Sequence, residues 1–338
     1  MVADSPGGGH IFQSHAWGEL KRSLGWEPLR LLMEKEGEVV GTAQLLLYSV
    51  LPMPGKLAFC PKGPWLPWDD EETVKIFFEA SRAIIKEKGV HTLKVEPEIE
   101  EEDEQSKTLL WDVGFEKFRW NLNHKTAYFV DLAPTEDEIV ANMKRGARYN
   151  ARLAERKGVE IVKDNSLEAQ ETFWEMFEIT AKRNGFWYRP REYQFRLWKA
   201  MFDVEQAHLF FAMHEGERLA GAIAYTFGDK CWYFQSATTN KKRNLKPTHL
   251  LQREMMKWAK RRGAVLYDMM AVPSPEDLEN EDHPLHGVYQ FKVGFGGEVR
   301  DFVGCLDLPV RPVLAKLWKK AEPLYYRAYR KLKKDIYY

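Results

Sequence analysis

Short apolar runs bounded by turn residues dominate the first part of the chain. Residues 30–34 and 39–50 predict two strands that meet at a Glu36-Gly37 turn. Over residues 71–88 the apolar side chains recur at helical spacing and stop at Gly89, which predicts a helix with a glycine C-cap. Further strands are expected at residues 57–60, 92–95 and 127–130. The first 130 residues therefore predict a mixed α+β domain.

A second succession of helices and strands follows residue 130. Thr135 and Glu138 have the spacing of a capping box, which predicts the start of a helix. Further helices are expected at residues 167–182, 192–201, 248–262 and 314–334, the last of them kinked or broken near Pro323. Strands are expected at residues 159–162, 208–214, 219–227, 231–236, 265–269 and 299–306. The similar order of the two halves predicts two duplicated α+β domains.

Composition favours a soluble, folded protein. The 338 residues are 44% hydrophobic and 13% aromatic, which excludes global disorder and favours two domains. Three cysteines, none in a Cys-x-x-Cys pair, indicate a reducing compartment. Residues 1–10 lack the features of a signal peptide and predict a flexible leader. The longest uncharged stretch, 39–55, is shorter than the roughly 20 residues of a membrane-spanning helix. We therefore expect a cytoplasmic protein and take a monomer as its state.

Charge is segregated along the chain although its total is zero, with 50 Lys+Arg against 50 Asp+Glu. Residues 142–157, 241–262 and 311–338 have net charges of +5, +8 and +7, and residues 69–104 have −8. A neutral total is therefore compatible with strongly basic local surfaces.

Helical spacing places the basic residues of these three segments on single helix faces. The first face has Arg145, Arg148, Arg152 and Arg156, opposite Met143, Ala147, Ala151 and Ala154. The second has Arg253, Lys257, Lys260 and Arg261, and the third has Lys316, Lys320, Arg327 and Lys331. These faces lack acidic i,i+4 partners. Each can bind a polyphosphate such as RNA or an anionic membrane surface, or is simply the solvated face of an amphipathic helix.

Several common catalytic motifs are absent. The sequence has no G-x-x-x-x-G-K-[ST], no strand-linked G-x-G-x-x-G, no H-E-x-x-H and no G-x-S-x-G. His283 and His286 lie in a polar loop without a third ligand nearby, so we expect neither a metal nor a cofactor. An enzyme built on this chain would work by positioning and electrostatics.

Two local clusters are candidate sites. Residues 183–193 combine three arginines with three consecutive aromatic residues, which suits phosphate binding and stacking on bases or sugars. The alternative is a loop that joins two helices and is closed by local ion pairs. Residues 287–297 place Lys292 among apolar residues and glycines, a pattern typical of a partly desolvated amine directed at a ligand, or of a snorkelling lysine.

Six short motifs extend over nearly the whole chain. They are Gln13-x-x-x-Trp17-x-x-x-Lys21-x-x-x-Gly25-Trp26, Pro61-Lys62-Gly63-Pro64, Arg148-Tyr149-Asn150-x-x-x-Ala154-x-x-Lys157-Gly158, Thr180-Ala181-x-Arg183, Tyr267-Asp268 and Phe291-Lys292-x-Gly294-Phe295. In this order and spacing they resemble the Fem family of aminoacyltransferases, the FemABX type that builds the side-chain bridges of peptidoglycan.

The resemblance implies an α+β fold of two tandem GNAT-like domains, in which the C-terminal helix packs back on domain 1. Domain 1 would comprise residues 1–130 with 312–338, and domain 2 would comprise residues 131–311. Some family members insert a long helical arm into the second domain. The short gap between the strand at Cys231 and the helix at Thr248 resembles the armless, FemX-like members.

The reaction implied by the resemblance is transfer of an amino acid from aminoacyl-tRNA to the stem-peptide amine of a peptidoglycan precursor, either UDP-MurNAc-pentapeptide or lipid II. Lys292, with Phe291 beside it, would contact the ester end of the tRNA and stabilise the oxyanion. Asp268 would orient the acceptor amine, or only cap a strand.

The resemblance also implies binding residues for both substrates. Lys21 and Arg189 would bind the diphosphate of the precursor, with Tyr193 and Tyr233 facing it. The residues around Tyr233 depart from the family's Tyr-Gly-Ala pattern. The tRNA would lie on Arg145, Arg148, Arg152, Lys257, Lys260 and Arg261.

Two other classes of function remain open from the sequence. One is an acyl-CoA-dependent N-acyltransferase on the same scaffold, although the absence of the usual acetyl-CoA loop glycines favours a tRNA donor. The other is a non-catalytic module that binds RNA or a membrane surface. Whether the acceptor is UDP-MurNAc-pentapeptide or lipid II, the protein can associate peripherally with the inner face of the cytoplasmic membrane.

Overall fold

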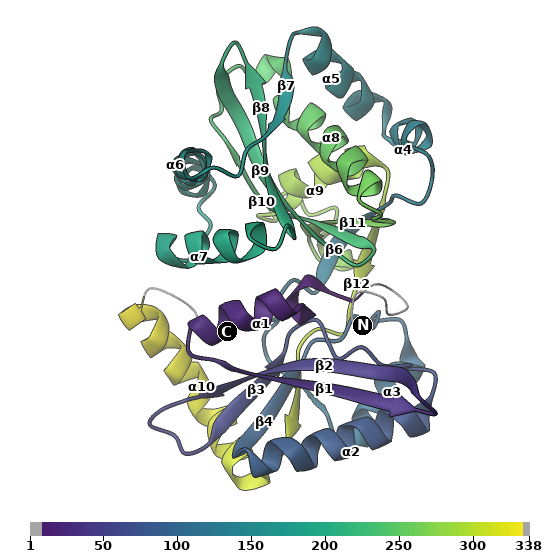
Figure 1. The fold of residues 1–338 in the computed structure, drawn as a ribbon, viewed down its shortest axis with the longest axis vertical. Helices are drawn as coiled ribbons and strands as arrows, with labels where there is room; N and C mark the ends of the chain where they lie inside the picture. The colour runs from purple at the N-terminus through teal and green to yellow at the C-terminus, as the bar shows by residue number, and fades with distance from the viewer. Residues whose placement is uncertain (1–8, 334–338) are drawn as a thin grey trace. The chain divides into compact units, whose positions relative to one another are not determined.

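The computed structural model describes residues 9–333, which form two compact units (Figure 1). Unit 1 contains the described residues up to Lys125 and those from Asp301 onward, and unit 2 is Thr126–Arg300. Both boundaries fall earlier than the predicted 130/131 and 311/312, because residues 126–131 pair within the sheet of unit 2 and residues 306–309 within that of unit 1. Of the predicted leader, residues 1–8 lie outside the described range, and His10 is buried.

Unit 1 is built on a six-stranded sheet in the order β1-β2-β3-β4-β13-β5. Its strands are β1 (Glu27–Lys35), β2 (Glu38–Ser49), β3 (Lys56–Cys60), β4 (Val90–Val95), β5 (Glu116–Lys117) and β13 (Leu306–Pro309). Its helices are α1 (His15–Ser23), α2 (Glu71–Glu87), α3 (Glu104–Val113) and α10 (Pro312–Lys333). The predicted β1–β2 hairpin and α2 are confirmed, and α2 buries Val74, Phe77, Phe78 and Ile85 as its spacing predicts.

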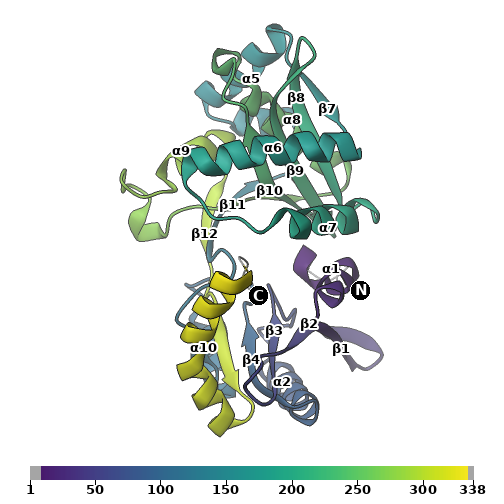
Figure 2. The same cartoon turned by 90° about the vertical axis from the view of Figure 1, so that its left-hand side faces the viewer.

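The C-terminal helix α10 packs back on unit 1, as predicted (Figure 2). Trp318 is buried beside His91, with ring centroids 5.8 Å apart. The predicted break near Pro323 is wrong, because α10 continues to Lys333. Proline has no N–H to donate to the Lys319 carbonyl four residues earlier. The Arg119 guanidinium donates to that carbonyl instead, at 2.7 Å.

Unit 2 is built on a seven-stranded sheet in the order β12-β6-β11-β10-β9-β8-β7. Its strands are β6 (Thr126–Asp131), β7 (Glu160–Lys163), β8 (Ala207–His214), β9 (Glu217–Phe227), β10 (Lys230–Thr238), β11 (Leu266–Ala271) and β12 (Glu298–Asp301). Its helices are α4 (Glu136–Asn142), α5 (Arg145–Arg156), α6 (Leu167–Asn184), α7 (Arg191–Phe202), α8 (Pro247–Arg261) and α9 (His286–Lys292). The predicted capping box at Thr135 and Glu138 is present at the start of α4.

Two features of unit 2 determine where its candidate site lies, at the end of β10 and the start of α8. The parallel strands β10 and β11 pair only from Lys230 to Trp232, although β10 continues to Thr238, so the two strands separate beyond that point. Residues 239–246 alone join β10 to α8, so no long helical arm is inserted there. The single strand expected at residues 299–306 is wrong, because it is divided into β12 and β13, which belong to different sheets.

Candidate functional site

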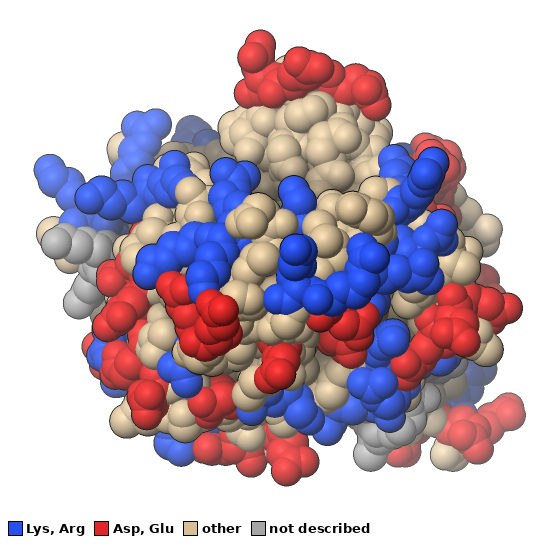
Figure 3. All heavy atoms as spheres, turned by 90° about the horizontal axis from the view of Figure 1, so that it is seen from above, with Lys and Arg blue, Asp and Glu red and all other residues tan. Residues whose placement is uncertain are grey.

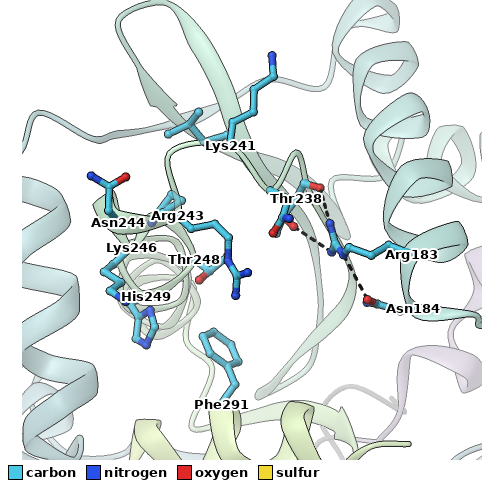
Figure 4. A pocket seen from close by; sticks show the side chains of 13 residues that line it. Arg183, Asn184, Thr238, Lys241, Arg243, Asn244, Lys246, Thr248, His249 and Phe291 are labelled. Atoms are coloured by element: carbon cyan, nitrogen blue, oxygen red, sulfur yellow. Dashed lines mark hydrogen bonds between the residues drawn. The ribbon is translucent and has the colours of Figure 1, made fainter.

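A cavity of about 710 Å³ opens in unit 2 around the first turn of α8 (Figure 4). Its walls come from the end of α6, the end of β10, the segment that joins β10 to α8, and α9. The basic, polar and aromatic side chains that line it include Arg183, Asn184, Thr238, Arg243, Lys246, His249 and Phe291. Arg243 and Phe291 project toward the cavity, whereas Lys241 points away from it.

The segment that joins β10 to α8 brings positive charge to the N-terminus of α8. Asn240, Lys242 and Lys246 have left-handed backbones, and no side chain caps the first turn of the helix. The side chains of Arg243 and Lys246 make no hydrogen bond or ion pair with other described residues. An uncapped helix N-terminus beside two such cations is suited to bind an anionic group such as a phosphate.

Arg183, in the last turn of α6, is fixed at one wall of the cavity. Its guanidinium donates to the Thr238 carbonyl at 3.4 Å and to the Thr238 hydroxyl at 3.2 Å. A third bond, of 3.3 Å, reaches the Asn184 side chain. Arg183 therefore connects α6 to the end of β10 and adds a positioned cation to the wall.

Aromatic rings form the floor of the same cavity. Phe291 contacts His249 and Phe295, with centroid distances of 5.2 and 5.0 Å. The His249 Nε2 atom lies 3.3 Å from the Asn150 amide of α5. Burial lowers the pKa of His249 to about 4, so its imidazole is neutral at pH 7. This surface combines flat apolar rings with a neutral polar group, which suits a nucleobase.

Lys292 is the last residue of α9 and is only 4% exposed. Its Nζ donates to the Ala271 carbonyl at 2.6 Å. Burial lowers the pKa of Lys292 to about 7, although the nearby Asp268 carboxylate favours the charged form. The side chain therefore exchanges a proton near neutral pH. It does not line the cavity itself, whereas its neighbour Phe291 does.

Asp268 lies on β11, the strand whose Ala271 carbonyl accepts the hydrogen bond from Lys292. Its Oδ1 accepts a 2.6 Å hydrogen bond from the backbone N–H of Met270, whose φ is +65°. The pairing of β11 with β6 is irregular between Asp268 and Ala271. This irregularity precedes the carbonyl that accepts from Lys292, so Asp268 supports the amine through the backbone.

Arg189 and Tyr193 come together as their one-turn spacing predicts. The guanidinium of Arg189 lies 4.3 Å from the centroid of the Tyr193 ring, which is buried at the start of α7. Tyr233, on β10, is partly buried against the core of unit 2, and burial raises the pKa of its hydroxyl.

Lys21 belongs to unit 1. It lies on α1, is 5% exposed, and its Nζ is 5.5 and 5.8 Å from the ring centroids of Trp17 and Trp26. The other candidate residues for catalysis and for binding the precursor all belong to unit 2.

The basic face of α5 is present as predicted. Met143, Ala147, Ala151 and Ala154 are buried on the opposite side. Arg145 and Arg152 are exposed, and Arg148 donates to the Ala141 carbonyl at 2.7 Å. Seen from above, at the end of unit 2 that carries α5, Lys and Arg side chains form a broad band (Figure 3). This band is an open cationic surface.

The basic residues of α8 are different, because the fold supplies acceptors that the sequence does not reveal. Lys257 and Arg261 both face Glu136 of α4, at 3.9 and 3.0 Å. Lys260 donates to the carbonyls of Leu132 and Ala133. The acidic partners missing at i,i+4 thus come from another element, and these cations are engaged within the protein.

A sequence model of the FemAB family matches residues 2–215 and 203–322. The chain belongs to the FemAB family. The two matched segments together include every candidate residue of the cavity, as well as Lys21 and Lys292.

Curated relatives of this FemAB chain match along its length. The lipid II:glycine glycyltransferases of Staphylococcus epidermidis and Staphylococcus aureus are each 22% identical to it, over 97% of this chain and 94% of theirs. The alignments extend over 397 and 402 residues, so the relatives contain segments that this 338-residue chain lacks.

Solved structures show the same fold. A crystal structure of FemX has a TM-score of 0.84 and 22% identity, over 92% of this chain and 95% of that one. A tandem GNAT protein from the clavulanic acid biosynthesis pathway has a TM-score of 0.50 and 13% identity, over 85% of this chain and 84% of that one. The predicted fold of two tandem GNAT-like domains is confirmed.

Sequence reasoning missed part of this FemAB site. Arg243, Lys246 and His249 line the cavity, but the basic run at residues 241–246 was assigned only to a charged segment. A usable signal was present, since Pro247 is typical of the first position of a helix and places this run at a helix N-terminus.

Residues 9–333 contain neither a candidate membrane span nor a candidate metal site. No helix in that range is long and apolar enough to cross a bilayer. No group of three or more His, Cys, Asp or Glu side chains there is arranged to hold a metal ion.

Proposed function

We propose that this protein transfers an aminoacyl group from aminoacyl-tRNA to the stem-peptide amine of a peptidoglycan precursor. The observation that supports this most is the cationic, aromatic cavity at the N-terminus of α8, next to the buried amine of Lys292, in a FemAB chain. The full-length similarity to lipid II:glycine glycyltransferases supports a precursor of this class as acceptor.

The cavity suits the 3′ end of a tRNA. Arg243, Lys246 and the N-terminal turn of α8, which no side chain caps, would bind terminal phosphates. The ring of Phe291 offers a face on which the terminal base can stack. The arginines of α5 would continue the contact along the RNA backbone.

Lys292 would act on the reacting ester. The acceptor amine attacks the ester carbonyl, an amide C–N bond forms, and the C–O bond to the ribose breaks. The proton lost by the amine passes to the ribose oxygen. Negative charge develops on the carbonyl oxygen during the attack, and an ammonium held away from bulk water stabilises it strongly.

We assign the precursor's diphosphate to Arg189, which is stacked on Tyr193, and to Lys21, with Tyr233 close to the bound precursor. Asp268 would orient the acceptor amine with its second carboxylate oxygen, while its Oδ1 accepts from the Met270 backbone. We further propose that the protein acts in the cytoplasm, as a monomer without a cofactor.

The test is a transfer assay with both acceptors. The purified protein is incubated with individually charged tRNAs and either UDP-MurNAc-pentapeptide or lipid II, and the precursor mass is measured. We expect a gain of one aminoacyl residue with one tRNA class and no gain with uncharged tRNA. Transfer of acetyl from acetyl-CoA without any transfer from charged tRNA would instead support the acyl-CoA alternative. Binding of RNA or lipid without any transfer would support a non-catalytic module.

A further inference from the structure

Helix α10 exposes large apolar side chains on the side that faces away from unit 1. Val313, Leu317, Leu324 and Leu332 are 75%, 55%, 68% and 80% exposed. With about 100° of rotation per residue, the first three lie within about 40° of one another on the helix surface. Water-exposed leucines in a row on one helix face are unusual for a surface that contacts only solvent.

Cations alternate with these apolar residues on the same face. Lys316, Lys320, Arg327 and Lys331 are all exposed there, and none makes a hydrogen bond or ion pair with other described residues. Glu322 is the one acidic residue between Pro312 and Lys333, and it is buried on the opposite side against Lys94. The outward face is therefore apolar and basic, without a negative charge.

The inner face of α10 is anchored independently of this surface. Ala315, Trp318 and Glu322 are buried against unit 1. Beside α10, Tyr48 at the end of β2 interacts with Tyr325. The outward side chains can therefore contact a partner without disturbing the fold of unit 1.

We propose that this face of α10 docks on an anionic phospholipid bilayer. Interfacial helices bind by inserting apolar side chains between headgroups while flanking cations attract anionic lipids. The basic face of α5 offers a contrast, because its exposed residues are arginines with Tyr149 as the one large apolar side chain. RNA uses the cations of such a face but gains nothing from leucines, so lipid fits α10 better.

The proposal does not depend on the proposed aminoacyl transfer. If both hold, docking through α10 places unit 1 at the surface where a lipid-linked precursor is found. The two fail separately, because vesicle binding requires no catalysis and transfer to a soluble precursor requires no membrane.

The experiment is flotation of the full chain with vesicles of phosphatidylcholine alone or with one-quarter phosphatidylglycerol. We expect binding to the anionic vesicles, weakening with salt, and at least a tenfold loss for the double variant Leu317→Asp/Leu324→Asp. Lys320→Gln is expected to lower binding roughly fivefold. The matched control is Leu167→Asp/Val204→Asp, which changes two exposed apolar residues of unit 2 and is expected to bind normally.

Three results would overturn the proposal. The first is equal flotation of the α10 double variant and the control. The second is equal binding to neutral and anionic vesicles. The third is loss of tRNA binding, but not of vesicle binding, in the α10 variants, which would assign this face to RNA. An unchanged urea-unfolding midpoint of the α10 double variant reports that the rest of the protein is intact.

Discussion

The proposed aminoacyl transfer depends most on one residue, Lys292, whose side-chain amine is buried. We expect Lys292→Met to lower kcat by about two to three orders of magnitude with a small effect on KM, because the charge it offers is used mainly in the transition state. Steady-state kinetics with charged tRNA measure both constants. A variant with unchanged kcat would remove Lys292 from the mechanism.

The same residue predicts a pH dependence. Burial lowers the pKa of Lys292 to about 7, so the ammonium is present below that pH and is lost as the pH rises through it. If the ammonium is the active form, the ratio of wild-type kcat to that of Lys292→Met falls as pH rises from 6 to 8. Taking the ratio cancels the titration of the acceptor amine. A ratio that rises over this range would mean that Lys292 acts as a neutral base.

Asp268 is expected to act as a positioning residue through the backbone of Met270. Asp268→Ala removes a charge-assisted hydrogen bond to a residue at positive φ, so it should lower the free energy of unfolding by about 1–3 kcal/mol and reduce kcat. Adding Met270→Gly should restore about 1 kcal/mol, because glycine adopts this φ without steric cost. Urea unfolding and kcat test both, with Asp268→Asn as the variant that retains an acceptor oxygen. No loss of stability in Asp268→Ala, or the same loss in Asp268→Asn, would contradict this role.

At the scale of elements, the N-terminus of α8 is the predicted phosphate site. Arg243→Glu/Lys246→Glu should raise the Kd for charged tRNA at least tenfold, and should reduce the slope of log Kd against log salt by about 0.7 for each lost phosphate contact. Filter binding over a salt series measures both. The control Lys75→Glu/Lys86→Glu changes two exposed cations of α2. Equal loss in the control would mean that only net charge matters.

The elements themselves show what the sequence can predict. Long periodic segments such as α2 and α6, and most strands of the two sheets, follow from their apolar spacing, whereas β5 and β13 were not predicted. Helices α1, α3 and α9 were not predicted, since each has ten residues or fewer and few buried apolar positions. The division of residues 299–306 between two sheets depends on long-range pairing, which local pattern does not contain.

For the site, the sequence identified several candidate residues but not the partners of the cations on α8. The family resemblance implies Lys292, Phe291, Arg189 and Tyr193, and the structure brings the last two together. The partners of Lys257, Lys260 and Arg261 lie more than 120 residues away in sequence, so the sequence alone could not separate engaged cations from free ones.

At the scale of the whole molecule, a buried ionic cluster joins three distant parts of unit 1. Lys94 of β4 lies 2.7 Å from Asp307 of β13 and 3.3 Å from Glu322 of α10, and all three are buried. Lys94→Met leaves two buried carboxylates without their cation, so it should destabilise unit 1 by about 3–5 kcal/mol. The exposed Lys75–Glu71 pair is the control, since Lys75→Met should change stability little. Similar losses for both variants in chemical denaturation would contradict the anchoring role of the cluster.

At this scale the zero net charge is the sum of three basic surfaces and an acidic remainder. The basic surfaces of α5, of the α8 N-terminus and of α10 differ in what surrounds their cations, and we assign them to RNA, to terminal phosphates and to lipid respectively. The acidic remainder compensates their charge, so total charge alone gives no information about either partner.

The measurement that tests the central claim most directly follows a labelled amino acid from its tRNA to the precursor. In a single-turnover reaction with labelled aminoacyl-tRNA and saturating precursor, the account predicts that label leaves the tRNA and appears on the stem peptide in an alkali-stable amide. It also predicts a rate about a hundredfold lower in Lys292→Met. Label that stays on the tRNA, or is released only as free amino acid, with every charged tRNA and both precursors would contradict it.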